Sequence, residues 1–125
     1  MRVVRIHADA SGVSHLDEAR IGLVPDHLGR ISRALAPGQG AFLRELRAGL
    51  SVDFHVAPRR QIIFVVGGAV EVEAGDGARA CVGPGEAIFV EDLEGRGHLT
   101  RVGAEKALCV YVPVAPDFDI RTVGG

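Results

Sequence analysis

The chain has 125 residues, of which 47% are hydrophobic and 24% charged, and its formal net charge is −2. This length and composition predict one folded domain rather than a disordered chain. The small net charge gives no electrostatic signature for binding nucleic acid. No apolar run approaches the ~20 residues that a membrane-spanning helix needs. The first residues show no secretory signal pattern, so we expect a cytoplasmic location.

The first third of the chain predicts one strand followed by less regular structure. The segment RVVRIHAD, residues 2–9, indicates an opening strand that ends at a turn over residues 10–12. Residues 14–24 have apolar positions near helical spacing, but the run is short and closes at Pro25. We therefore predict an irregular or strand-like arm there. Residues 26–40 are rich in Gly and Pro and predict mostly loop.

From about residue 41 the pattern predicts β-structure throughout. Strands are expected at Ser51–Ala57 and Gln61–Val66, joined through Pro58. Gly67-Gly68 then predicts a two-residue hairpin turn, because both glycines tolerate positive φ. Residues 70–73 alternate Val with Glu, so this strand should have one buried and one wet face.

One predicted strand needs cover on two sides. Ile62–Val66 is apolar on both faces. A second sheet can cover one face, and a partner chain or the N-terminal arm can cover the other. A lone small domain would leave some of this surface wet, so we expect a homodimer.

Further short strands follow, separated by Gly- and Pro-bearing turns. They are predicted near residues 79–82, 87–90, 98–102 and 107–112, with an acidic loop over residues 91–97. Many short strands at this spacing indicate a sandwich or barrel. Cys81 and Cys109 lie in apolar strand-like runs without metal-binding or redox spacing, so we expect inert core thiols.

Two motifs resemble signatures of the cupin superfamily. GLSVDFHVAPRRQIIFVVGG, residues 49–68, has the spacing of G-x5-H-x-H-x3-E-x6-G, with His55 in the first histidine position. Ala57 replaces the second histidine, and Gln61 replaces the glutamate. GPGEAIFV followed by His98 is similar to the second signature, and both segments together resemble small single-domain cupins without an assigned reaction. The resemblance implies an all-β fold, a double-stranded β-helix (jelly-roll) barrel with an N-terminal arm. It implies a single cupin domain over residues 1–125 with a core barrel at about 41–114.

In metal-binding cupins the corresponding positions hold one divalent ion. Carried over, the resemblance implies His55, Gln61 and His98 as ligands of Zn, Fe, Mn or Ni, although an amide oxygen is a poorer donor than a carboxylate. A carboxylate from the acidic loop (Glu91, Asp92 or Glu94) could complete the set. The alternative is a polar pocket in which the two histidines hydrogen-bond to neighbours such as Gln61.

Other side chains are candidates for binding a small molecule. An Arg59-Arg60 pair at a barrel mouth could hold a carboxylate or phosphate in bidentate fashion, or could be a solvated turn. Strand alternation places Thr100 on the face of His98 and Arg101 on the opposite face. Tyr111 could line the barrel. The candidate ligand-binding residues are therefore His55, Arg60, Gln61, His98, Thr100 and Tyr111. His7, His15 and His27 have no ligand spacing to one another and are expected at the surface.

Two functional hypotheses follow, and the sequence leaves both open. The first is a binding module that holds a small, anionic molecule in the barrel pocket, with a degenerate metal site. The second is a metal-dependent cupin enzyme of the dioxygenase or isomerase type, using His55, His98 and a third oxygen ligand.

Overall fold

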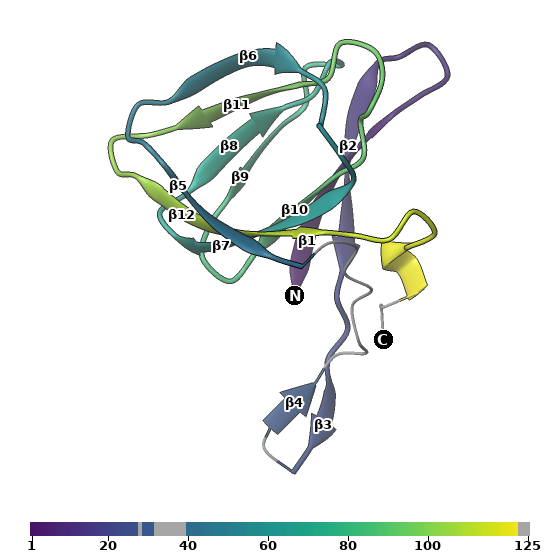
Figure 1. Cartoon of the computed structure of the whole chain (residues 1–125), viewed down its shortest axis with the longest axis vertical. Helices are drawn as coiled ribbons and strands as arrows, with labels where there is room; N and C mark the ends of the chain where they lie inside the picture. The colour runs from purple at the N-terminus through teal and green to yellow at the C-terminus, as the bar shows by residue number, and fades with distance from the viewer. Residues whose placement is uncertain (28, 32–39, 123–125) are drawn as a thin grey trace.

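The computed structural model describes residues 1–27, 29–31 and 40–122, and within these ranges the protein is all-β. One short 3-10 turn, η1 (Ile120–Thr122), is the helical element of the described chain. No helix among these residues is long and apolar enough to cross a membrane. The prediction of an all-β domain is confirmed (Figure 1).

Two sheets make up the body of the molecule. The six-stranded sheet has, in order, β2 (Ser14–Arg20), β1 (Arg2–Ala8), β10 (Ala87–Val90), β7 (Gln61–Gly67), β12 (Ala107–Pro113) and β5 (Phe42–Leu46). The four-stranded sheet has, in order, β6 (Ser51–His55), β11 (His98–Val102), β8 (Val70–Glu73) and β9 (Arg79–Val82). Backbone hydrogen bonds do not close the two sheets into one barrel.

The main core lies between the two sheets. Strand alternation explains it: along β12, Ala107, Cys109 and Tyr111 are buried while Leu108 is exposed. On β8, Val70 and Val72 are buried at 2% and 1% exposure, so the expected buried face is confirmed, whereas Glu71 and Glu73 on the other face are only partly exposed. The same inner faces also line the cavity described below.

A second core covers the outer face of the six-stranded sheet. Ile62 and Phe89 pack there against Ile21, Phe118 and Ile120. The outer face of β7 is therefore covered at Ile62 by residues that follow β2 and by the C-terminal segment of the same chain. Val66, further along β7, remains 50% exposed.

The N-terminal residues, predicted to form an arm, are part of the six-stranded sheet. Strand β1 lies inside the six-stranded sheet, paired antiparallel with β2 and parallel with β10. Its side chains are apolar on both faces, with Val3 in the outer core and Val4 and Ile6 in the inner one. Residues of β1 therefore contribute to both core clusters.

The predicted hairpin at Gly67-Gly68 is wrong. Strands β7 and β8 belong to different sheets, so this turn carries the chain from one sheet to the other. Gly68 has φ +70°, and a Cβ there would lie 2.4 Å from the carbonyl oxygen of Lys106. The glycine is needed because another turn passes close to it, rather than because the chain reverses.

Two local predictions also need correction. The region predicted as loop contains a small hairpin of β3 (Val24–Asp26) and β4 (Gly29–Ile31), which Figure 1 shows extending from the body. Residues 28 and 32–39 of that predicted loop lie outside the described residues. Cys109 is buried as expected, but Cys81 is exposed.

Surface histidines form ion pairs with acids. His15 lies between two carboxylates, with Nε2 2.7 Å from Asp9 Oδ2 and Nδ1 2.9 Å from Asp76 Oδ2. These hydrogen bonds raise the pKa of His15 above its usual 6.5. His7 Nε2 lies 3.1 Å from Asp17. Neither histidine lines the cavity.

Candidate functional site

The two motif histidines lie side by side on neighbouring strands. His98 on β11 is the register partner of His55 on β6, and their ring centroids are 4.7 Å apart. Directly opposite side chains of an antiparallel pair are the closest cross-strand neighbours. The prediction that both imidazoles enter the same cavity is confirmed, since both line it.

Gly97 permits this approach of the two strands. It has φ +80°, and a Cβ there would lie 1.8 Å from the carbonyl oxygen of His55. A side chain at this position would push β11 away from β6 and separate the rings. The glycine immediately before His98 is therefore part of the site's construction.

Both imidazoles are held through Nδ1. His98 Nδ1 lies 2.5 Å from Oδ2 of Asp92, and His55 Nδ1 lies 2.9 Å from the carbonyl oxygen of Asp53. A carbonyl and an ionised carboxylate only accept hydrogen bonds, so each Nδ1 donates. In the neutral rings the Nε2 lone pairs are left for other partners.

The buried carboxylate of Asp92 accepts a hydrogen bond from His98. Its side chain is 0% exposed, and that of His98 is 6% exposed. Its second oxygen, Oδ1, has no hydrogen-bond partner within the described part of the chain. The sequence offered Asp92 as a metal ligand, but its carboxylate contacts the ring nitrogen of His98 instead.

The histidines open on a cavity of about 410 Å³ between the two sheets. Most of its wall is aliphatic, and several of these side chains also belong to the main core. The lining aliphatic residues are Leu46, Leu50, Val52, Val56, Ala57, Ile63, Val70, Val72, Ile88 and Val90. Its polar groups come from His55, His98, Gln61, Thr100, Tyr111 and Arg44. A mostly apolar wall with a few converging polar groups is the usual form of a small-molecule site.

Arg44 is the cation of this cavity, and the sequence reasoning missed it. It lies on β5, on the inward face with Phe42, and its guanidinium is 4.9 Å from the ring centroid of Tyr111. Phe42 stacks on the same ring at 5.0 Å. Arg44 forms no ion pair with a carboxylate among the residues the structure describes. The signal was available in the alternation of FLREL, once β5 is placed beside β12.

Tyr111 is a buried residue, 7% exposed. Desolvation raises the pKa of Tyr111, and the nearby Arg44 only partly opposes this. The phenol therefore stays protonated at neutral pH and can donate a hydrogen bond into the cavity.

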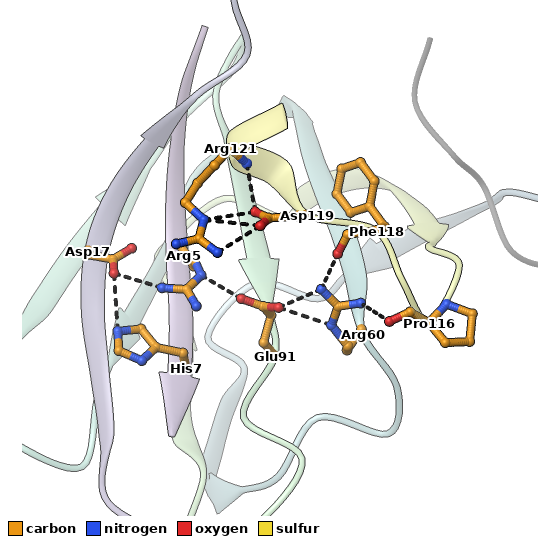
Figure 2. Close-up of polar contacts among 9 residues, drawn as sticks. All are labelled: Arg5, His7, Asp17, Arg60, Glu91, Pro116, Phe118, Asp119 and Arg121. Carbon is orange, nitrogen blue, oxygen red and sulfur yellow. Dashed lines mark hydrogen bonds and ion pairs between the residues drawn. The ribbon is translucent and has the colours of Figure 1, made fainter. Parts of the chain in front are cut away.

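Arg60 lies elsewhere: its guanidinium is over the ring of Phe89, a residue of the outer core, and beside Glu91 and the C-terminal segment (Figure 2). Its guanidinium donates to Glu91 Oε1 at 2.6 Å and to the carbonyl oxygens of residues 115, 116 and 118. All three guanidinium nitrogens have partners, Nε in Glu91 alone and the two terminal nitrogens in the C-terminal carbonyls and Glu91, and Arg60 is not among the residues that line the cavity. The interpretation of Arg60 as a ligand-binding residue is not supported by this placement.

Gln61 and Thr100 line the cavity as predicted. The amide oxygen of Gln61 accepts a 3.4 Å hydrogen bond from Arg59 Nη1. No hydrogen bond joins Gln61 to either imidazole in the described ranges, so that expected contact is not formed. Arg101 pairs with Glu71 and Glu73 on the other face, as strand alternation predicted.

The side chains at the motif positions fit a divalent cation poorly. Two imidazoles and one amide supply no negative charge to compensate the ion. Ala57 contributes no ligand atom, and the nearby carboxylate of Asp92 is committed to Nδ1 of His98. Among residues 1–27, 29–31 and 40–122, no group of three or more His, Cys, Asp or Glu side chains could hold a metal ion.

Fold and site together define an all-β protein of two facing sheets with a histidine-lined internal cavity. No family model matches the sequence, and no curated protein matches it. Among solved structures, a conserved protein of unknown function from Streptococcus pyogenes is similar with a TM-score of 0.47 and 21% identity, over 70% of this chain and 75% of that chain. A likeness at this level assigns neither a family nor a function.

Proposed function

We propose that the protein is a cupin-type, jelly-roll binding module that holds a small organic anion in the cavity between its sheets. The observation that carries this proposal is the position of Arg44. Its guanidinium lines a largely apolar cavity and has no carboxylate partner among the described residues. The cupin-like motif spacing around His55 and His98 supports the fold assignment, and their convergence supports the site.

The cavity wall indicates the chemistry of the ligand. Arg44 can bind a carboxylate through two parallel N–H donors. Tyr111 and the two imidazole Nε2 atoms offer one donor and two acceptors for a second polar group. The aliphatic wall favours an apolar body, because burying it there gains about 25 cal/mol per Å² of apolar surface. A carboxylate on an aromatic body matches the cation and the aliphatic wall.

Phenylacetate is a suitable probe, with neutral phenylacetamide as its matched control. Binding to the folded state at about one hundred times Kd would stabilise it by ~2.7 kcal/mol, or about 10 °C in Tm for a domain of this size. We expect phenylacetate to raise Tm and phenylacetamide to do so far less. Arg44→Met should remove most of the difference, whereas Arg59→Met on the exposed turn should leave it. Equal responses to the acid and the amide would contradict the proposal.

A second candidate function is a metal-dependent enzyme with His55, His98 and a third oxygen ligand. It is favoured by the anchored Nδ1 atoms, since metal-binding histidines usually have the second nitrogen hydrogen-bonded in this way. The missing anionic ligand argues against it. We therefore expect Zn²⁺, Fe²⁺, Mn²⁺ or Ni²⁺ to leave Tm almost unchanged.

The matched variant restores the missing ligands. Ala57 and Gln61 both line the cavity, so Ala57→His with Gln61→Glu would place a second imidazole and a carboxylate near the existing pair. This double variant should gain a metal response. Stoichiometric metal in untagged wild-type protein, released by His55→Ala, would instead establish the enzyme candidate.

We also propose that the protein is a cytoplasmic homodimer. Support comes from the uncovered part of the outer sheet face, where Leu43, Val66 and Leu108 are 67%, 50% and 39% exposed on β5, β7 and β12. Light scattering at micromolar concentration should give twice the chain mass of 13.2 kDa. A monomer mass would contradict the dimer.

A further inference from the structure

His98 and His55 differ in the group behind each ring. The carboxylate of Asp92 accepts the Nδ1 proton of His98, whereas a neutral backbone carbonyl accepts that of His55. A carboxylate in this position fixes the tautomer and stabilises the positive charge that the ring acquires when Nε2 takes a proton. Of the two rings, His98 is therefore the one arranged as a proton acceptor.

The burial of Asp92 supports this role. Its side chain is 0% exposed, and Oδ1 has no partner in the described residues. Burying an ionised carboxylate is costly unless it is paired. Here the imidazole of His98 is its only side-chain partner among those residues, so the pair acts as one unit. A purely structural role would be met by a neutral side chain at lower cost.

The other polar groups of the cavity complement a base. Arg44 can hold a carboxylate, and the protonated hydroxyl of Tyr111 can donate to an oxygen that becomes negatively charged. The aliphatic wall makes the surroundings of these polar groups mostly apolar. These groups match a substrate that has a carboxylate, a carbonyl and an acidic C–H bond beside the carbonyl.

We propose that the cavity catalyses keto–enol proton transfer on small 2-oxo carboxylates, with His98 as the base and Asp92 as its positioning residue. Nε2 of His98 takes the proton from the carbon next to the carbonyl, and the C–H electron pair forms a C=C bond. The carbonyl π pair moves to the oxygen, which accepts a hydrogen bond from Tyr111. The imidazolium then returns its proton to that oxygen or to the carbon, so no oxidant or other co-reactant is needed. This inference rests on the anion-binding function proposed above.

The test uses phenylpyruvate in D₂O with chelator-treated protein. Loss of the CH₂ signal in the proton NMR spectrum measures exchange, and a thermal shift with the same compound measures binding separately. General-base catalysis typically contributes 10²–10⁴-fold, so we expect exchange at least about tenfold faster than in buffer alone. His98→Gln should lose this acceleration while still binding phenylpyruvate.

Asp92→Asn separates positioning from folding. An amide oxygen at residue 92 can still accept from Nδ1 but lacks the charge, so kcat should fall at least about tenfold while KM stays nearly constant. Arg44→Met should mainly raise KM. His15→Gln is the matched control, because this histidine also contacts carboxylates but lies outside the cavity, and its exchange rate should equal that of the wild type.

The outcomes distinguish the two proposals. Binding of phenylpyruvate without accelerated exchange would overturn the proton-transfer inference and leave the anion-binding function standing. No binding of phenylpyruvate or phenylacetate would overturn both. Exchange that vanishes on chelation and returns with added Zn²⁺ would overturn the role given to Asp92 and His98. If His98→Gln does not fold, unchanged kcat in Asp92→Asn would equally overturn it.

Discussion

Replacing Arg60 tests whether this side chain holds the C-terminal segment or binds a ligand. Its guanidinium contacts Glu91 and three carbonyl oxygens, and it lies 5.4 Å from the ring centroid of Phe89. In Arg60→Ala these carbonyls lose a charged donor next to the outer core that Phe118 helps to form. The segment over residues 114–120 should loosen with them.

The size of the effect follows from those contacts. Hydrogen bonds to charged groups contribute roughly 1.5–3 kcal/mol each, and breaking a buried pair costs roughly 3–5 kcal/mol. Glu91 keeps a second partner in Arg5, and the Arg60 side chain is 20% exposed, so both figures must be reduced. We expect Arg60→Ala to lower the free energy of unfolding by about 2–4 kcal/mol.

Urea denaturation measures this loss, and the neighbouring arginine supplies the control. Arg59 is exposed and makes one 3.4 Å hydrogen bond, so Arg59→Ala should cost less than about 0.5 kcal/mol. The urea midpoint of Arg60→Ala should fall by about 1–2 M with an unchanged slope. Phenylacetate should still raise its Tm. Equal stability of the two variants, or selective loss of ligand binding in Arg60→Ala, would refute the structural role.

Three further predictions concern the surface and the turns. The pKa of His15 is raised because its hydrogen bonds to Asp9 and Asp76 favour the charged imidazole in the folded state. Its stabilising contribution is therefore complete below pH 6.5 and is lost as pH rises through the raised pKa. The stability difference between wild type and His15→Gln in urea should shrink as the pH is raised above 6.5, and a difference that grows would contradict this. Gly68→Ala should lower the free energy of unfolding by roughly 2–4 kcal/mol, because the new Cβ would lie 2.4 Å from the carbonyl oxygen of Lys106. Gly103→Ala is the control: a Cβ there has no atom within 4 Å, so its stability in urea should be nearly that of the wild type. A thiol reagent should modify Cys81 quickly and Cys109 only after unfolding, because Cys109 is buried and burial raises its pKa; two fast thiols would disprove the burial.

The sequence predicts the strands well and their arrangement less well. Alternation in AVEVE identified Val70 and Val72 as the buried side chains of β8, because that property is local. The partner of each strand is not local: Gly67-Gly68 satisfies the pattern of a hairpin, yet the chain changes sheets there. The parallel pairing of β1 with β10 joins segments more than eighty residues apart, and nothing in either segment specifies the other.

The same distinction applies to the candidate site. The motif positions placed His55, Gln61, His98 and Thr100 on the cavity wall, because spacing along a strand fixes the face. Arg44 was missed because its surroundings depend on which strand lies beside β5, and Arg60 was placed at the ligand site because the packing of the C-terminal segment is not visible in the sequence. A charged residue in a sequence does not reveal whether its partner is a ligand or a distant carbonyl.

The central claim is that the cavity between the sheets binds an organic carboxylate at Arg44 and the two histidines. Titration of ¹⁵N-labelled protein with phenylacetate, followed by amide and imidazole NMR spectra, tests it most directly. The account predicts saturable chemical-shift changes at Arg44, Tyr111, His55 and His98. It predicts no change at His15, which lies outside the cavity. Shifts confined to the outer surface, or no saturable shift in the cavity at millimolar phenylacetate, would contradict the account.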